Sequence, residues 1–305
     1  MKKLLPLVCF LMFSNSLRLE AVSDDPSVIK EAEQLLAADP ESRDDNDLIR
    51  FDLKLDEIES KVAKGVQTRI LAELAKGQNP SSLEYIRSIF ESRADRRHDA
   101  AYALSLAAIE RPVNLQDWRF LVRSLTVVEG EQAVSVLKAL KRFRQRATKP
   151  DWIRQVILIA LRLPEDQQPH AIRLLEYWSG EKLDKPGQSS AETIAAYQNW
   201  FELENPESPK PVLPVDPPDR KWTYAKLLPE LDRLKSDPET LELGRLAYEK
   251  AKCHTCHQKD KTGEHRGPDL SSLGWRRQKK EILEALLYPS QVIHEEYVTS
   301  IVVTK

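Results

Sequence analysis

Apolar residues recur at every third or fourth position from about residue 48 to residue 204, as they do on one face of an amphipathic helix. Ile70, Leu71 and Leu74 follow this spacing, and so do Ile86 and Phe90. Short polar stretches that contain a proline interrupt the pattern at 78–80, 111–112, 149–150, 164–166 and 185–187. Because proline ends or kinks a helix, the pattern predicts a series of helices at 48–204. A polar lead-in at 22–47, with one short helix near 28–38, precedes them.

Two parts of the helical segment resemble each other. Asp117-Trp118 opens the first part, and Asp151-Trp152 opens the second part 34 positions later. Each part reads as a helix, a short polar turn and a second helix, in which the aspartate can cap the first helix and the tryptophan can pack under the next unit. Helix pairs that repeat at this length predict a HEAT-like solenoid, in which each pair buries its apolar face on its neighbour. An irregular helical bundle is the alternative, and both folds are all-α.

Six prolines between residues 204 and 218 mark the clearest break in the chain. Proline-rich segments favour extended polyproline geometry over helix. We therefore predict a semi-rigid linker at 205–220, which separates a helical repeat domain at 48–204 from a second domain at 221–305 and holds the two apart.

The second domain is predicted to begin with two helices. The first covers roughly residues 222–234. Asp237 can cap the second, because Pro238 is tolerated in a first turn. This second helix runs into Cys253, and Gly244 on its surface would allow a close helix crossing.

Composition and charge limit the classes of function. The chain has 305 residues and a net charge of −2, with 31% charged residues of both signs, so we expect neither nucleic acid nor an anionic membrane surface as a partner. Two lysines precede a short apolar run at 4–13, which is too short to span a bilayer. Residues 1–21 therefore read as a signal peptide, with an uncleaved anchor as the alternative. We expect an exported, periplasmic protein without a transmembrane span after cleavage.

The strongest chemical signal is Cys253-His254-Thr255-Cys256-His257, which matches the C-x-x-C-H attachment motif of c-type haem. Two thiols at this spacing can form thioether bonds to haem, and the adjacent His257 can bind the iron as its proximal ligand. Cys9 lies in the predicted signal peptide, so the processed chain would carry its only two cysteines in this motif. The sequence predicts one covalent haem c.

Three other interpretations of the motif remain open, one of which is a chance match in solvent-exposed sequence. A structural zinc ion could be bound by Cys253, Cys256, His257 and His265, although a second ligand pair at a typical spacing is missing. A thioredoxin-like redox pair would follow a strand, whereas the sequence before Cys253 predicts a helix.

Residues after the motif are candidates for the surroundings of the haem. A carbonyl within Gly267–Leu270, with Pro268 as the candidate, can accept a hydrogen bond from Nδ1 of His257 and fix its tautomer. Leu270 is expected to line the haem face, and Arg276 to bind a propionate. Basic residues near the motif are candidates for an electrostatic docking patch or for ordinary solvated surface; they are Lys259, Lys261, Arg266, Arg276, Arg277, Lys279 and Lys280.

Residues 239–305 resemble the C-terminal haem-binding domain of large secreted planctomycete-type proteins, a branch of the class I cytochrome c fold. The likeness rests on G-R-x-x-Y from Gly244, C-H-T-C-H, G-P-D-L from Gly267, the stretch 270–276 and the stretch 288–297. The resemblance implies an all-α domain with a short β-strand near its C-terminal end, here 297–304, behind a helical repeat region.

One departure from that family concerns the sixth iron ligand. The resemblance implies a methionine after a β-hairpin, followed by a closing helix, but Met1 and Met12 are the only methionines here. We therefore expect an incomplete haem domain whose iron lacks a strong sixth ligand, with His294 as the one residue that could substitute.

The sequence thus predicts a mono-haem electron carrier, rather than an enzyme, that exchanges one electron with a redox partner protein. The alternatives are a haem-bearing acceptor subunit of a sugar or alcohol dehydrogenase, and a helical-repeat scaffold with a vestigial haem domain.

Overall fold

The computed structural model describes residues 26–58, 60–111, 114–231, 233–234 and 237–289. These residues are mostly helical and contain no strand, apart from one isolated antiparallel bridge between Lys259 and Thr262. The all-α prediction is confirmed for them. The predicted signal peptide, the strand at 297–304 and His294 lie outside the described residues. No described helix is both long and apolar enough to cross a membrane.

The chain divides into two compact units, residues 1–70 and 71–305. In the first unit, α1 (Pro26–Ala37) is followed by a short 3₁₀ turn, by α2 (Asp45–Leu55) and by the first part of α3 (Lys61–Lys76). The predicted short helix near 28–38 is present as α1. Gln67 ties α3 to α2, because its amide donates to the Asp52 carbonyl at 2.9 Å.

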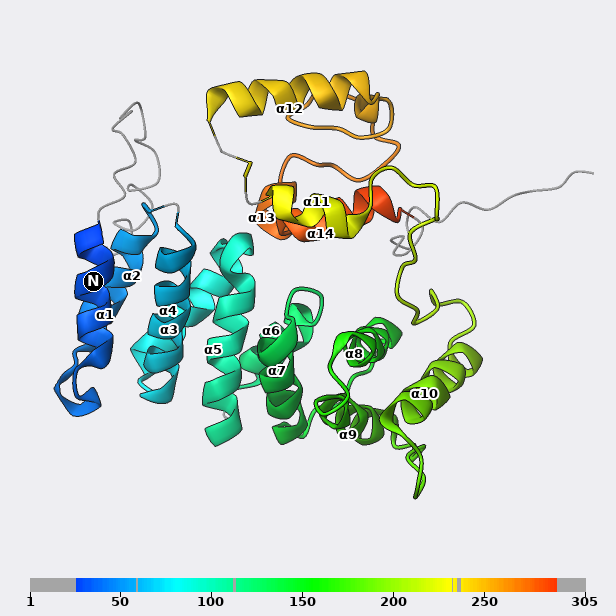
Figure 1. Cartoon of the computed structure of the whole chain (residues 1–305), viewed down its shortest axis with the longest axis horizontal. Helices are drawn as coiled ribbons and strands as arrows, with labels where there is room; N and C mark the ends of the chain where they lie inside the picture. The colour runs from blue at the N-terminus through cyan, green and yellow to red at the C-terminus, as the bar shows by residue number, and fades with distance from the viewer. Residues whose placement is uncertain (1–25, 59, 112–113, 232, 235–236, 290–305) are drawn as a thin grey trace, which may run out of the picture. The chain divides into compact units, whose positions relative to one another are not determined.

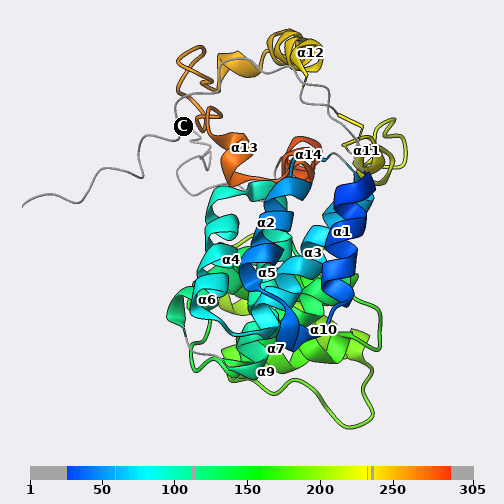
Figure 2. The same cartoon turned by 90° about the vertical axis from the view of Figure 1, so that its left-hand side faces the viewer.

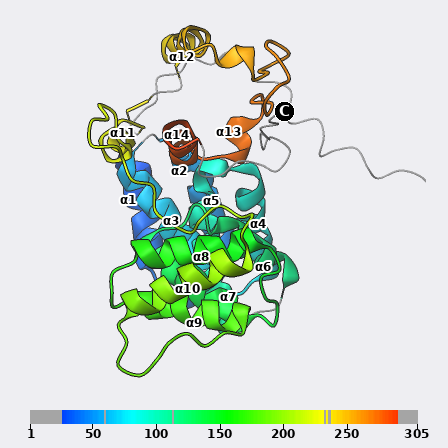
Figure 3. The same ribbon diagram turned by 90° about the vertical axis from the view of Figure 1, so that its right-hand side faces the viewer.

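The second unit begins with helices that pack side by side in chain order (Figure 1). Their bounds are α4 (Pro80–Ser92), η2 (Ala94–Arg96), α5 (Arg97–Glu110), α6 (Leu115–Ser124), α7 (Gly130–Arg142), α8 (Pro150–Arg162), α9 (Gln168–Ser179) and α10 (Ser190–Glu204). Figure 3 shows α8, α9 and α10 in mutual contact. Buried Leu, Ile, Val and Ala side chains from each of these helices form the core.

In the two Asp-Trp pairs the tryptophans pack against each other across the two units, whereas the aspartates do not cap their helices as predicted. The rings of Trp118 and Trp152 do meet, edge to face, with centroids 5.5 Å apart. However, Asn114 is the residue that caps α6, and Asp117 lies buried in its first turn. Asp117 binds Nε and Nη2 of Arg87 at 2.7 and 3.0 Å, so it forms a buried ion pair with α4. Asp151 also lies in a first turn and caps nothing, because Lys149 is the N-cap of α8.

The Pro-rich segment is held by the helices that precede it. Arg154 on α8 is 2% exposed, and its Nε donates to the carbonyls of Pro209 and Lys210 at 2.9 and 3.1 Å. Gln198 on α10 donates to the carbonyl of Pro211 at 2.7 Å. The first half of this segment is therefore bonded to α8 and α10, while the linker at 205–220 stays a prediction. The expected domain boundary at 205–220 falls within the second unit.

The remaining elements are short. They are α11 (Tyr224–Leu231), α12 (Pro238–Lys250), η3 (Cys253–Thr255), α13 (Leu273–Arg276) and α14 (Lys279–Leu287). Asp237 caps α12 as predicted, because its carboxylate accepts from the Thr240 amide at 2.7 Å. The expected close crossing at Gly244 is absent among the described residues, since a Cβ built there meets nothing within 4 Å.

The start of α14 lies against the start of α5 (Figure 2). The side chain of Gln278 accepts from the backbone of its own first turn, which only its amide oxygen can do. Its Nε2 therefore faces Nδ1 of His98, at 3.1 Å. Lys280 donates to the Val127 carbonyl at 2.8 Å, and its ammonium lies 3.1 Å from Glu129.

We predict that Asp117→Asn costs about 3 kcal/mol in the free energy of unfolding, because it removes the buried carboxylate that binds the Arg87 guanidinium and leaves the exposed Glu84, at 3.2 Å, as its carboxylate partner. The matched control is Asp151→Asn. Asp151 occupies the same position of the Asp-Trp motif but is exposed, so this substitution should cost less than about 1 kcal/mol in the free energy of unfolding. Urea unfolding of both variants measures the two costs. Equal costs would show that the buried pair contributes no more than an exposed helix-start aspartate.

We also predict that His98 makes the protein less stable in mild acid. Burial lowers the pKa of His98, although Asp99, Asp95 and Glu129 oppose this and Lys280 adds to it. The native state therefore favours the neutral ring. The unfolded chain binds more protons, so stability is full above the unfolded pKa of about 6.5 and falls as the pH drops below it. His98→Gln should reduce the difference in urea midpoint between pH 7.5 and pH 5.5. The same change at the exposed His265 is the control, and an unaltered difference in His98→Gln would contradict the prediction.

Candidate functional site

The C-x-x-C-H motif begins where α12 ends. Lys252 has a left-handed backbone, with φ of 58°, which turns the chain out of α12 into η3. The amides of Cys256 and His257 both donate to the Cys253 carbonyl, at 3.2 and 2.9 Å. This single turn gathers the two thiols and the imidazole on one short segment. Cys253 is partly exposed, Cys256 is exposed, and neither forms a disulfide.

The chain then runs back along the motif, and three amides of segment 263–270 donate to backbone carbonyls of residues 254–258. The Glu264 amide donates to His254 at 3.0 Å, and the Gly267 amide donates to Cys256 at 2.7 Å. The Leu270 amide donates to Gln258 at 2.8 Å. Segment 263–270 therefore lies along the motif and fixes its conformation through these hydrogen bonds.

His257 is oriented by the expected backbone carbonyl. Its Nδ1 lies 2.9 Å from the carbonyl oxygen of Pro268. Because a carbonyl only accepts, Nδ1 must carry the proton, and the neutral imidazole then has its lone pair on Nε2. Nε2 is thus the atom left to bind a metal, the arrangement typical of metal-binding histidines.

Two glycines permit this close approach. A Cβ built on Gly267 would lie 2.8 Å from Cε1 and 2.9 Å from Nδ1 of His257. A Cβ on Gly263, whose φ is +104°, would lie 2.3 Å from the His257 carbonyl oxygen. Real Cβ atoms cannot approach that closely, so glycine at both positions is a steric requirement of this loop.

Tyr248 is a site residue whose polar role the sequence did not reveal. Its hydroxyl donates to the carbonyl of His257 at 2.7 Å, which ties the motif back to α12. Partial desolvation raises the pKa of this hydroxyl. The sequence signal for Tyr248 was its position on the face of α12 that leads to the cysteines, and that signal suggested packing only.

The other predicted residues lie close to the loop. Pro268 is exposed and Leu270 is partly exposed. Nη2 of Arg276 donates to the carbonyl of Asp269 at 2.8 Å, so Arg276 contacts the loop that bears Pro268. Asp269 accepts two hydrogen bonds from Ser271, and these lower the pKa of the Asp269 carboxyl.

The basic residues of 276–280 are committed to contacts within the chain. Arg277 pairs with Glu281 at 2.9 Å, Lys279 donates to the Leu234 carbonyl at 3.1 Å, and Lys280 binds Val127 and Glu129. Arg277 and Lys279 remain exposed all the same, so a docking patch and plain solvated surface both stay predictions for this run.

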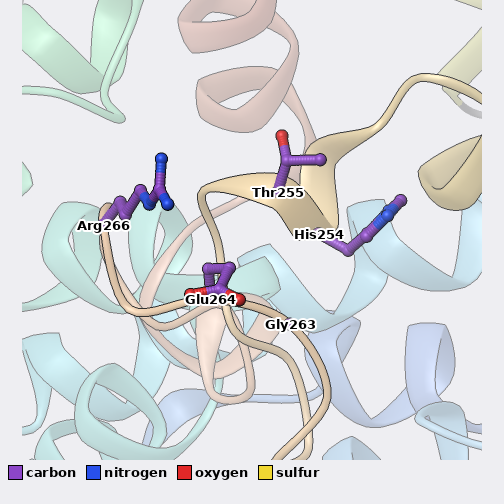
Figure 4. A pocket seen from close by; sticks show the side chains of 5 residues that line it. All are labelled: His254, Thr255, Gly263, Glu264 and Arg266. Carbon is purple, nitrogen blue, oxygen red and sulfur yellow. The ribbon is translucent and has the colours of Figure 1, made fainter.

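A hollow of about 400 Å³ lies beside the motif, on the side of the residues between the two cysteines (Figure 4). It is lined by His254, Thr255, Gly263, Glu264 and Arg266, and so by neither sulfur nor His257. Nδ1 of His254 is buried there with no hydrogen-bond partner among the described residues.

A structural zinc site would need several ligand side chains that lie close together. Among the residues that the structure describes, no three His, Cys, Asp or Glu side chains are grouped to hold a metal ion. Cys253, Cys256, His257 and His265 therefore do not form a zinc ligand set in this conformation. A search of protein families, curated proteins and solved structures found no match to the chain.

We predict that Gly267→Ala displaces the His257 ring and removes its Nδ1–H tautomer. The reason is the 2.8 Å approach between the added Cβ and the ring. Nitrogen-15 chemical shifts of the His257 ring in the haem-free chain report the tautomer directly. Gly274→Ala is the matched control, because a Cβ there meets nothing within 4 Å. A retained Nδ1–H tautomer in Gly267→Ala would contradict the prediction.

Proposed function

We propose that this chain is an exported mono-haem c-type cytochrome that transfers single electrons to and from a redox partner protein. The observation that carries the proposal is the hydrogen bond between His257 Nδ1 and the Pro268 carbonyl, beside two unpaired cysteines at the C-x-x-C spacing. A histidine held in this tautomer can offer Nε2 to iron without any rearrangement of the loop.

The residues present fit a haem in three respects. The donor set is two accessible thiols and one neutral imidazole, as covalent attachment and axial ligation require. Leu241, Leu243 and Leu246 on the adjacent α12 are 65, 60 and 47% exposed, and no described residue of α12 is buried. Apolar surface of this kind is favourably covered by a porphyrin ring.

The roles of the chain's own residues follow from their contacts. Cys253 and Cys256 would anchor the haem covalently, and His257 would be its proximal ligand. Pro268 holds the ligand's proton at Nδ1, Tyr248 fixes the ligand's backbone, and Leu270 would line the ring. Bound haem supplies the iron centre that takes up and releases one electron.

Arg276 is proposed to bind a propionate with the donors that Asp269 does not use, because a guanidinium carries five donors. The family likeness, the HEAT-like repeat, the periplasmic location and His294 as sixth ligand belong to the same proposal. They rest on the sequence.

The proposal predicts covalent haem in the full chain expressed with an export signal and a haem-ligation system. Haem staining on a denaturing gel and a pyridine haemochrome spectrum detect it. Cys253→Ala with Cys256→Ala should abolish the stain, because no thioether can form. Lys252→Ala, adjacent to the motif but without a thiol, is the control and should stain as the wild type does. An unstained wild type, or a stained double variant, would refute the proposal.

A further inference from the structure

The loop that orients His257 is linked to the helical part of the same unit by one buried cation. Arg97 stands at the start of α5 and is 8% exposed. Its Nη1 donates to the backbone carbonyl of Arg276 at 2.8 Å, and its Nε donates to the Phe90 carbonyl at 3.2 Å. One guanidinium thus joins the end of α4 to the end of α13.

The contact continues from Arg276 toward the proposed iron ligand. The Arg276 side chain donates to the carbonyl of Asp269 at 2.8 Å. Asp269 follows Pro268, whose carbonyl lies 2.9 Å from His257 Nδ1. Residues 268–276 therefore form a strap, which is bonded to His257 at one end and to Arg97 at the other.

Neighbouring contacts hold the strap's far end in the same place. Gln278 bonds His98, and Lys280 bonds the Val127 carbonyl, so two further residues of α5 and of the segment before α7 fix the start of α14. Arg97 is the member of this set that acts directly on α13 and hence on the strap.

Among these residues, Arg97 is the one for which the loss of a hydrogen-bond partner costs most. Its guanidinium lies over the Phe90 ring, 5.4 Å from the centroid, in a buried position. Burial lowers the pKa of Arg97, and the nearby Arg123 and Arg277 add to this while Glu281 opposes it. A buried cation needs acceptors. Release of the Arg276 carbonyl would leave one of its donors without that acceptor, so the contact favours one position of the strap.

We propose that Arg97 is a positioning residue for the haem site, which sets the strength of the Pro268–His257 hydrogen bond through the strap at 268–276. The inference rests on the proposed function, because it assigns His257 to iron. The helical segment adjusts the electronic properties of the iron ligand from outside the motif, since a stronger Nδ1–H bond makes the ligand more basic and so favours ferric iron.

The first test uses the haem-free full chain and does not depend on haem. In Arg97→Met, exchange of the Gly267 and Leu270 amides with deuterium should be faster by about tenfold, the factor expected for one lost hydrogen bond from a charged donor. Arg97→Lys keeps the charge but cannot reach both carbonyls with one rigid fork, and should show an intermediate rate. Arg123→Met is the matched control, because the exposed Arg123 also lies over Phe90, at 5.5 Å from the ring centroid, and bonds no residue of the strap among those that the structure describes.

The second test uses the haem-loaded chain. In Arg97→Met the iron–histidine stretching frequency should fall and the midpoint potential should rise, because a looser strap weakens the Nδ1–H bond. Arg123→Met removes a nearby positive charge, so it controls for electrostatics alone. Should Arg97→Met fail to fold, Arg276→Gln breaks the next link of the strap from an exposed position and should speed the exchange of the Gly267 and Leu270 amides in the haem-free chain.

The outcomes separate the two proposals. Wild-type chain that binds no haem would refute the proposed function, while the exchange experiment would still measure the strap. Equal exchange rates and an equal iron–histidine frequency in Arg97→Met and Arg123→Met would overturn the positioning role, even in a chain that carries haem.

Discussion

The hydrogen bond between His257 Nδ1 and the Pro268 carbonyl is the constraint on which the arrangement of the site depends. It joins two residues eleven positions apart, and it can form only because Gly267 and Gly263 have no side chains to collide with His257. Three amides of the returning segment bond carbonyls of 254–258, so the loop path is fixed along its length. The imidazole tautomer is consequently determined by backbone geometry before any ligand arrives. Preorganisation of this kind lowers the entropy cost of binding a metal through Nε2.

Two segments that follow α10 are fixed to the helices by the same kind of contact. Arg154 binds the carbonyls of Pro209 and Lys210, and Arg97 binds that of Arg276. Burial lowers the pKa of both guanidinium groups. Irregular segments have carbonyls that no ladder or helix uses, and a buried guanidinium has five donors to satisfy. Each contact therefore meets the needs of both partners, and it requires no apolar core from the irregular segment.

Local signals in the sequence were enough to predict the helices, the cap at Asp237 and the carbonyl that meets His257, because each depends on residues close in the chain. Asp117 shows where local reasoning ends. Its partner Arg87 lies 30 positions earlier, and the nearby Asn114 was the better cap signal, since it stands immediately before α6. The prolines of 205–220 correctly predicted that this segment is not helical, but not that Arg154 would hold it. Likewise, the sequence showed that the run 276–280 is basic but not which residues it contacts. It showed that Tyr248 carries a hydroxyl donor but not that the His257 carbonyl accepts from it.

The distribution of buried side chains indicates why a haem would matter to this part of the chain. Between residues 221 and 289, Leu283 and Gln278 are the buried side chains that the structure describes, whereas α4 to α10 share a large apolar core. Ordering each residue costs about 1–2 kcal/mol of conformational entropy, which a segment normally offsets by burying apolar surface. The leucines of α12 offer such surface but remain exposed. Under the proposed function, the porphyrin would provide the missing apolar partner. Covalent attachment at Cys253 and Cys256 would then couple the folding of this segment to haem acquisition, since the segment without haem has little core of its own.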